Sequence, residues 1–331
     1  MNQAPLHELE DFSFSGGQAF FYEINEEDQL RIAFWNMEST KGTIILQSGR
    51  TEFIEKYYEV IEEFVSRGFA VAMMDWRGQG LSSRTAKNKR LGHIDKFETY
   101  DEDFKSVMNN YVQSKCPKPF IGFGHSMGGC LLTSYFISDD NLFDKCILCA
   151  PMVSVRANAL SRKIVGALGL LEIFGLGSFP MQKPQWDDEN GWAEEELFEE
   201  NALTSDERRF NRTYRLISKF PELGVKGISV GWLKHAFKRT NQFKSLDWTK
   251  AIKKPLLLLD ATEDKLVNSQ LNKDLLGQSS LVTIKSINSQ HEIMMENDEI
   301  RKEAWKSIDC LLYTSDAADD TPCVDLGGRR I

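Results

Sequence analysis

Short apolar runs alternate with amphipathic helical patterns along most of the chain, and no other feature constrains the fold as strongly. Between these runs, apolar residues recur at helical spacing, as in 53–64 and 97–111. Strands buried on both faces of a sheet read as continuous apolar runs, and parallel strands need crossover connections that are usually helical. The alternation therefore predicts an α/β fold with a mostly parallel sheet and helices on both faces. The strand-like runs are 43–47, 69–74, 119–123, 146–150, 256–260 and 281–285, preceded by a predicted hairpin of 19–24 and 30–35.

The alternation stops between Met152 and about Thr240. This stretch contains an apolar run, Ile164–Phe179, an acidic segment, Trp186–Asn201, and helical patterns around Phe210–Phe220 and Trp232–Phe237. We interpret 152–240 as a helical cap inserted into a core made of 1–151 and 241–309.

The run Ile164–Phe179 is the most apolar part of this predicted cap. It is short for a membrane span and contains Glu172 and several glycines, which argues against a membrane helix. We expect it to line or guard an apolar channel to the nucleophile, as a mobile lid does. The alternative is that it forms a buried helix of the cap.

The composition argues against several classes of protein. The formal net charge is -9 and there is no basic run, so nucleic-acid binding is not expected. The first residues, Met1 to Asp11, lack the basic start and apolar run of a secretory signal, which favours a cytoplasmic location. Cys146 and Cys149 form a C-x-x-C pattern inside an apolar run without a second pair, so we predict buried strand cysteines and no metal site.

The last residues, 310–331, differ in character from the rest. Codons for Cys310–Asp319 and Val324–Ile331 reproduce what resembles a sequencing adapter joined to a transposase end. We therefore interpret 310–331 as a translated adapter artefact that should be excluded from fold reasoning. The expectation is that residues from Cys310 onward are disordered and dispensable.

The strongest chemical signal is the G-x-S-x-G motif Gly124-His125-Ser126-Met127-Gly128. It follows the predicted strand 119–123 and precedes a helical pattern, 129–137. A serine on a sharp turn between strand and helix is the nucleophile arrangement of hydrolases, and the flanking glycines avoid collisions at that turn. Ser126 is the predicted nucleophile.

A serine nucleophile needs a base, because a free hydroxyl attacks weakly near neutral pH. In this arrangement the chain order is serine, acid, histidine. His291 follows the last predicted strand and is the predicted base. The other histidines precede or adjoin Ser126 or fall in the cap: His7, His93, His125 and His235.

The orienting acid should follow the strand 256–260 and precede His291. Asp264 is the predicted acid, with Glu263 and Asp260 as competitors. When a serine attacks a carbonyl group, the negative charge that develops on the carbonyl oxygen also needs backbone N–H donors. We predict those of Met127, directly after the nucleophile, and Arg50, in the loop after strand 43–47.

At these residues the chain resembles the bacterial lysophospholipases and monoacylglycerol lipases of the α/β-hydrolase superfamily. The resemblance covers most of 20–305, although Ser48-Gly49 stands where the family often has His-Gly. The matching stretches are Gly49–Phe53, Asp75–Gly80, Gly124–Gly129, Ala150–Met152, Asn201–Thr204, Ala261–Val267 and His291-Glu292.

The resemblance implies a serine hydrolase that cleaves a small lipid ester without a metal or organic cofactor. It implies that Ser126 is the nucleophile, Asp264 the acid and His291 the base, with Arg50 and Met127 as oxyanion donors. It is also compatible with peripheral contact between the cap and a membrane, and it assigns no oligomeric state.

Two other functions stay open from the sequence alone. One is an aminopeptidase of the same superfamily, in which carboxylates of the acidic run Asp187–Glu200 would hold the substrate's ammonium group. The other is a non-catalytic binding protein on the same fold, since a fold does not specify a function. The acyl length and head group of the substrate are not assigned.

Overall fold

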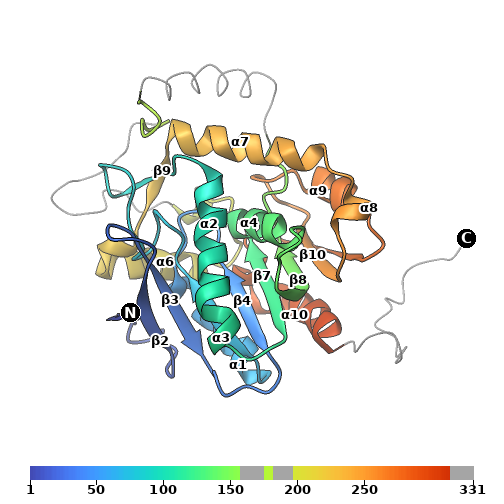
Figure 1. Ribbon diagram of the computed structural model, residues 1–331, viewed down its shortest axis with the longest axis horizontal. Helices are drawn as coiled ribbons and strands as arrows, with labels where there is room; N and C mark the ends of the chain where they lie inside the picture. Colours follow the sequence, from blue (N-terminus) through green and yellow to red (C-terminus); the bar gives the residue numbers. More distant parts are fainter. Residues whose placement is uncertain (157–174, 182–196, 314–331) are drawn as a thin grey trace, which may run out of the picture.

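A computed structural model describes residues 1–156, 175–181 and 197–313. Within these ranges nine strands form one twisted sheet in the order β1-β2-β3-β5-β4-β7-β8-β10-β11 (Figure 1). The pairs from β5 to β11 are all parallel, and β1, β2 and β3 extend the sheet in antiparallel pairs. The predicted mostly parallel sheet is confirmed. The strands are β1 (Asn2–Ala4), β2 (Gln18–Glu23), β3 (Gln29–Trp35), β4 (Thr43–Gln47), β5 (Ala70–Met74), β7 (Phe120–His125), β8 (Phe143–Cys149), β10 (Leu256–Ala261) and β11 (Val282–Ile287).

Helices cover both faces of the sheet (Figure 1). Side chains of the central strands alternate between two apolar clusters, so that Leu256 and Leu258 of β10 join one and Leu257 and Leu259 join the other. This double burial explains why the strands read as continuous apolar runs. One cluster includes residues of α2 (Phe97–Val107), α4 (Ser126–Phe136) and α9 (Ser269–Leu276), and the other includes residues of α1 (Tyr58–Ser66) and α10 (Asp298–Tyr313). Shorter helices are η1 (Ile54–Tyr57), η2 (Met108–Val112), α3 (Gln113–Lys115), α8 (Trp248–Ala251) and η6 (Ile293–Met295).

The C-terminal helix α10 corrects one sequence-based expectation. Cys310 to Tyr313 continue this helix instead of being disordered. Leu311 and Leu312 pack against the apolar cluster of that face, and Lys145 Nζ donates a hydrogen bond to the Leu311 carbonyl at 2.9 Å. The helix extends because these two leucines continue the apolar spacing of Trp305 and Ile308. The remaining tail, 314–331, lies outside the described residues, and its origin stays a prediction.

The described part of the predicted cap contains the predicted helical segments. They are α6 (Glu207–Lys219) and α7 (Val230–Lys244), together with η4 (Phe198–Glu200), η5 (Pro221–Leu223) and the short strand β9 (Lys226–Ile228). The helix α7 crosses above α4 at the top of Figure 1, and β9 pairs with β6 (Leu91–Gly92) of the core. This pairing joins two segments that are far apart in the chain.

Several predictions about the cap concern residues outside the described ranges. Most of the run Ile164–Phe179 and of the segment Trp186–Asn201 lies outside the described residues, so the lid stays a prediction. The division into core and cap at 152 and 240 also stays a prediction. No helix in the described ranges is long and apolar enough to cross a membrane.

The two cysteines of the C-x-x-C pattern lie in β8. Cys146 and Cys149 are fully buried free thiols, which confirms the prediction of buried strand cysteines. Burial raises the pKa of both thiols. Neutral, inaccessible thiols of this kind act as small apolar side chains.

Candidate active site

Ser126 lies at the sharp turn where β7 runs into α4. Its φ is +50°, in the left-handed region that residues other than glycine rarely adopt. Neighbouring glycines allow this turn, because a Cβ on Gly124 would lie 2.8 Å from the Cα of Gly129. A Cβ on Gly128 would lie 2.5 Å from the carbonyl oxygens of Gln47 and Ser48. The G-x-S-x-G pattern is therefore a steric requirement of this turn.

The structure brings the three predicted residues Ser126, His291 and Asp264 into one hydrogen-bonded chain. His291 Nε2 lies 2.8 Å from Ser126 Oγ, and His291 Nδ1 lies 2.6 Å from Asp264 Oδ2. His291 and Asp264 are buried. The distances are those of a nucleophile, its base and the orienting acid.

The environment of Asp264 favours its charged form. Burial opposes ionisation, but the hydrogen bond from His291 and those from the backbone N–H groups of Val267 and Leu266 outweigh it. Together they hold the pKa of Asp264 below its usual value. The two backbone bonds reach Oδ1 and leave Oδ2 for the histidine. An ionised carboxylate fixed in this way orients the imidazole.

The two competing acids are placed elsewhere. Glu263 is exposed. Asp260 forms an ion pair with Lys273 at 3.0 Å and accepts hydrogen bonds from Ser269 and Ser286. The structure therefore brings Asp264, and neither competitor, to His291.

The loop after β4 lies directly beside Ser126. A Cβ on Gly49 would lie 3.2 Å from Ser126 Cβ, so this loop carries Arg50 close to Ser126. Met127 is the second residue of α4, in the first helical turn, where backbone N–H groups have no acceptor within the helix. Both predicted oxyanion donors thus belong to segments that meet at Ser126. That their N–H groups stabilise an oxyanion stays a prediction.

The stretch Asp75–Gly80 holds this loop in place. Trp76 Nε1 donates to the Ser48 carbonyl at 3.0 Å. The Gln79 side chain bonds to three residues of the loop. Its Nε2 donates to the carbonyls of Gly49 at 2.9 Å and Glu52 at 3.3 Å, and its Oε1 accepts from Thr51 N at 2.9 Å. The buried Gln79 side chain therefore fixes the backbone on both sides of Arg50.

A buried charged cluster under Ser126 was not anticipated from the sequence. Lys56 Nζ lies 2.9 Å from Glu52 Oε1 and 2.6 Å from Glu292 Oε1, and Glu52 Oε2 lies 3.1 Å from His125 Nδ1. Tyr57 also donates to Glu52, at 2.7 Å. The sequence feature that could have indicated this cluster is the spacing of Glu52 and Lys56, which lie four residues apart at the start of a helical pattern.

Charges in this cluster stabilise one another. Burial opposes ionisation of Glu52, but Lys56 and His125 outweigh it and hold the pKa of Glu52 well below its usual value. Burial also opposes protonation of His125, yet Glu52 raises the pKa of this histidine. The Nε2 of His125 lies 3.3 Å from the His291 carbonyl oxygen. The cluster therefore connects the loop after β4 to the backbone of the predicted base.

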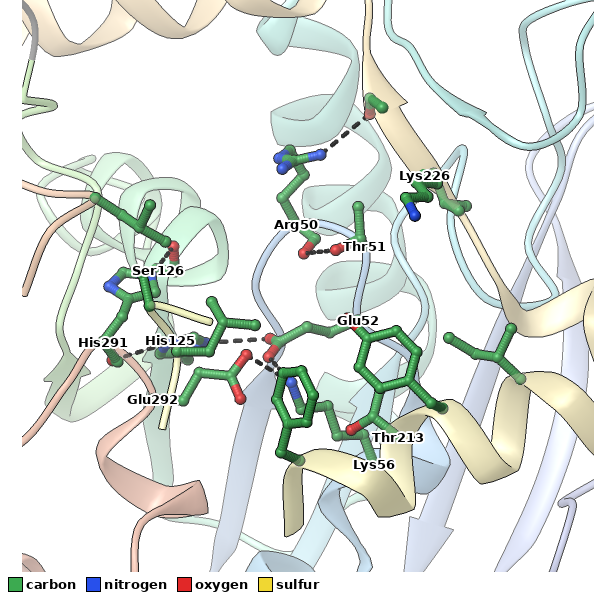
Figure 2. A pocket seen from close by; sticks show the side chains of 18 of the residues that line it. Arg50, Thr51, Glu52, Lys56, His125, Ser126, Thr213, Lys226, His291 and Glu292 are labelled. Atoms are coloured by element: carbon green, nitrogen blue, oxygen red, sulfur yellow. Dashed lines mark hydrogen bonds and ion pairs between the residues drawn. The ribbon is translucent and has the colours of Figure 1, made fainter. Parts of the chain in front are cut away.

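A cavity of about 330 Å³ opens at Ser126 and His291 (Figure 2). Its lining is mixed, with charged groups on the loop after β4 and on β9, and apolar groups mostly from the cap. Lys226 and Thr213 lie across the cavity from Ser126 in Figure 2. The apolar and aromatic lining is Ala202, Leu203, Phe210, Tyr214, Ile217, Val225 and Leu266. This lining matches a molecule with an apolar part and a polar part.

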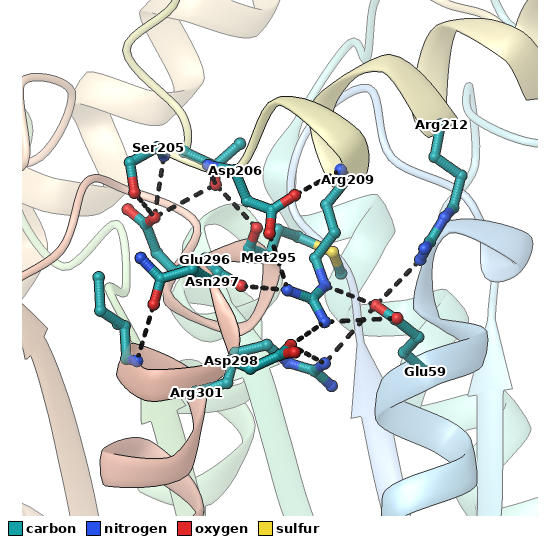
Figure 3. A network of polar contacts seen from close by, with 12 residues as sticks. Glu59, Ser205, Asp206, Arg209, Arg212, Met295, Glu296, Asn297, Asp298 and Arg301 are labelled. Carbon is teal, nitrogen blue, oxygen red and sulfur yellow. Dashed lines mark hydrogen bonds and ion pairs between the residues drawn. The ribbon is translucent and has the colours of Figure 1, made fainter.

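A second polar network attaches the cap to the core beside this cavity (Figure 3). Arg209, near the start of α6, donates to Glu59 of α1 at 2.7 Å, to Asp298 of α10 at 2.6 Å and to the Glu296 carbonyl at 2.7 Å. Arg212 lies 2.9 Å from Glu59 as well. One buried arginine thus joins α6 to two core helices.

Glu296 extends this network toward the predicted base. Its Oε1 accepts from the backbone N–H of Gln290, the residue before His291, at 2.8 Å. Its Oε2 accepts from Ser205 N, just before α6, at 2.9 Å. The start of α6 and the histidine loop are therefore held by the same carboxylate.

We expect the network to make stability depend on pH through Glu59. Burial opposes its ionisation, but Arg209 and Arg212 outweigh it and lower the pKa of Glu59 to about 2. A pKa lowered by folding gives stability that is present above the unfolded value, near 4.5, and is lost as the pH falls toward 2. Glu59→Gln should lower the free energy of unfolding by about 1–3 kcal/mol at pH 7 and by much less at pH 3.

Urea unfolding of wild type and variant at pH 7, 5 and 3 measures this difference. Glu62→Gln, on the same helix but exposed, is the matched control and should change little at any pH. A destabilisation by Glu59→Gln that is equal at all three pH values would contradict the electrostatic explanation.

Comparisons with known proteins agree with this geometry. The model of the family described as serine aminopeptidase, S33 matches residues 38–298. The probable lysophospholipase L2 of Haemophilus influenzae is 26% identical, over 83% of this chain and 84% of its own length. Lysophospholipase L2 of Escherichia coli K12 is 25% identical, over 91% of this chain and 88% of its own length.

Solved structures show the same fold. A soluble variant of the monoglyceride lipase of Saccharomyces cerevisiae matches with a TM-score of 0.69 at 15% identity, covering 92% of this chain and 99% of its own. A carboxyl esterase of Bacillus coagulans matches with a TM-score of 0.68 at 17% identity, covering 90% of this chain and 98% of its own. The predicted α/β-hydrolase fold is confirmed.

Proposed function

The chain belongs to the serine aminopeptidase S33 family of α/β-hydrolases, and we propose that it hydrolyses carboxylic esters of lipids, either lysophospholipids or monoacylglycerols. The observation that carries this proposal is the hydrogen-bonded triad of Ser126, His291 and Asp264. It lies at a cavity with a mixed apolar and charged lining. Relatives named lysophospholipase L2, which match over most of their length, support the same substrate class.

In the proposed mechanism, His291 Nε2 accepts the proton of Ser126 Oγ as the oxygen attacks the ester carbonyl carbon. The negative charge that develops on the carbonyl oxygen is stabilised by the backbone N–H groups of Arg50 and Met127. Asp264 stabilises the imidazolium and keeps its orientation. The carbon–oxygen bond to the alcohol then breaks, and His291 returns the proton to the leaving alcohol. The acyl group stays on Ser126.

Water completes the cycle by the same route. His291 takes a proton from water, which attacks the acyl carbon, and the fatty acid leaves as Ser126 regains its proton. Every proton transfer in this sequence uses His291, so no step needs a metal or organic cofactor.

An aminopeptidase is the second function to consider, because the S33 family is described by that activity. It needs a carboxylate available for the substrate's ammonium group. The two buried carboxylates at the cavity, Glu52 and Glu292, are both bound to Lys56, which favours the ester hydrolase. Most of the acidic run Asp187–Glu200 lies outside the described residues, although Glu200 lines the cavity. The hydrogen-bonded triad disfavours a purely binding function.

We also propose that the cap contacts a membrane surface, where long-chain lipid esters reside. Large apolar side chains are exposed in its described part: Leu176 (45% exposed), Phe179 (59%) and Leu197 (59%). Exposed apolar groups of this size are typical of surfaces that contact a membrane.

A hydrolysis panel tests the proposed function. The purified protein should cleave lysophospholipids or monoacylglycerols with a kcat/KM at least 100-fold above that for aminoacyl anilides. A 100-fold ratio corresponds to about 3 kcal/mol of transition-state stabilisation, a typical difference between the substrate that a site fits and one that it does not fit. Free fatty acid released from each ester and chromophore released from each anilide are measured in parallel. Faster cleavage of the anilides would contradict the ester assignment.

A further inference from the structure

His125 lies directly before Ser126 and has a side chain that the proposed mechanism does not use. It is the last residue of β7 and precedes α4, so the turn that presents Ser126 also fixes the position of His125. Figure 2 shows its ring between Glu52 and His291. The ring centres of His125 and His291 are 4.9 Å apart, and both residues are buried. A second imidazole therefore lies between the nucleophile turn and the histidine loop.

Both ring nitrogens of His125 face hydrogen-bond acceptors. Nδ1 lies 3.1 Å from Glu52 Oε2, and Nε2 lies 3.3 Å from the carbonyl oxygen of His291. Glu52 Oε2 also accepts from the Tyr57 hydroxyl at 2.7 Å and from the backbone N–H of Gly49, as an ionised carboxylate does. A neutral imidazole carries one N–H, whereas these two acceptors require two. The geometry therefore requires the doubly protonated, positively charged ring.

The charges around His125 support this imidazolium. Burial opposes its protonation, but Glu52 outweighs burial and raises the pKa of His125. Lys56 is paired with both Glu52 and Glu292, so a protonated His125 gives the cluster two cations for two carboxylates. A neutral ring would leave one buried negative charge without a counter-charge, which is costly in the interior of a protein.

We propose that His125 is a positioning residue, whose imidazolium holds the backbone of His291 and thereby keeps the base beside Ser126 during the reaction. The proposal rests on the proposed ester hydrolase and adds a residue to its mechanism. The hydrogen bond from His125 Nε2 joins the residue before the nucleophile to the base itself. It therefore links the two reacting side chains through the backbone, independently of their direct contact.

Other backbone bonds of the histidine loop lead away from the nucleophile turn. The N–H of Gln290 donates to the Glu296 side chain at 2.8 Å. The N–H of Glu292 donates to the Leu203 carbonyl, in the predicted cap, at 2.7 Å. These two bonds fix the loop to the start of α10 and to the cap, whereas the bond from His125 fixes it to the turn that carries the nucleophile.

This bond should matter most once Ser126 has been acylated. In the free enzyme, the hydroxyl of Ser126 lies 2.8 Å from His291 Nε2 and also holds the base. In the acyl-enzyme that oxygen belongs to an ester and has no proton to donate. His291 then keeps its bond to Asp264, and its carbonyl keeps the bond from His125. We therefore expect His125 to contribute more to deacylation, when His291 takes a proton from water, than to acylation.

Two substitutions separate the two hydrogen bonds of His125. Asparagine can place its NH₂ group near the position of Nδ1, so His125→Asn keeps a donor for Glu52 and loses the donor for His291. Glutamine is longer and can place its NH₂ group near the position of Nε2, so His125→Gln keeps the donor for His291. A p-nitrophenyl ester acylates the purified proteins. Absorbance of nitrophenol measures acylation, and the intact mass of the protein measures the decay of the acyl-enzyme.

His125→Asn should lower the rate constant of deacylation about 10- to 100-fold, as expected for the loss of a charged hydrogen bond, and lower acylation much less. His125→Gln should restore most of the deacylation rate. His93→Asn is the control, because His93 is a buried histidine bonded to Ser229 and Asp95, and it should leave the ratio of the two rate constants unchanged. An equal loss in both steps in His125→Asn, or no rescue in His125→Gln, would mean a merely structural role.

The charge of His125 can be measured in the wild type, even if a variant fails to fold. Nitrogen-15 NMR of the histidine-labelled protein at pH 7 should show one fully doubly protonated ring, at a pH where a histidine with an ordinary pKa near 6.5 is mostly neutral. The signal should be absent from His125→Gln. A wild-type spectrum without any such ring would overturn the proposal.

The outcomes also distinguish this inference from the function on which it rests. A wild type that forms no acyl-enzyme at Ser126 would overturn the proposed ester hydrolase. A wild type that forms and loses the acyl-enzyme, together with unchanged deacylation in His125→Asn, would overturn the positioning role of His125 alone.

Discussion

Replacing Ser126 or His291 with alanine should lower kcat about a million-fold for any ester that the protein cleaves. The reason is geometric, because Ser126 Oγ and His291 Nε2 are 2.8 Å apart and act as one unit. Without the histidine, the hydroxyl has no base, and without the hydroxyl, the base has no nucleophile. Because the two act together, the double variant should be hardly slower than either single variant.

Steady-state release of fatty acid, with purified variants checked for unchanged melting temperature, measures this loss. Ser134→Ala, a serine farther along the same helix α4, is the matched control and should retain full activity. A kcat of the Ser126→Ala variant equal to that of the wild type would contradict both the nucleophile assignment and the proposed mechanism.

Asp264→Asn should lower kcat about ten-thousand-fold while leaving the fold intact. The backbone N–H groups of Leu266 and Val267 both donate to Oδ1. An asparagine would keep its oxygen there and turn its NH₂ group toward His291 Nδ1. That nitrogen would then have to accept a hydrogen bond, so the ring proton would move to Nε2. A protonated Nε2 cannot take the proton of Ser126.

The pH–rate profile of Asp264→Asn adds a second readout, since the variant lacks the carboxylate that stabilises the imidazolium. Its residual activity should rise toward alkaline pH, where hydroxide assists the reaction directly. Glu263→Gln changes the exposed neighbouring carboxylate and should have little effect. An equal loss in both variants would mean that Asp264 is not the orienting acid.

Features that depend on neighbouring residues could be predicted from the sequence. The strand–turn–helix around Ser126 is local, because its glycines, the apolar run of β7 and the start of α4 lie within a few residues of one another. The chain order then pointed to His291, since this base follows the last strand of the sheet. The C-terminal helix also had a local signal in the spacing of Trp305 and Ile308, which the interpretation of the tail left unused.

Features that depend on how distant elements pack were decided only by the tertiary structure. Three acids lie at the end of β10 or just after it, and the direction of each side chain selects among Asp260, Glu263 and Asp264. Lys56 contacts Glu292 across 236 positions of the chain, and Arg50 contacts Gly227 across 177.

The physical reason is that periodicity records which face of an element is buried, but not what it is buried against. From the sequence alone, the expected position of Glu52, Lys56 and Glu292 is the protein surface, because charged residues are rarely buried without a partner. Their partners become visible only when the loop after β4, η1 and the histidine loop meet beneath Ser126. The sequence by itself thus determined the fold class and the order of the reactive groups. The packing of the cap and the loops determined which charges surround them.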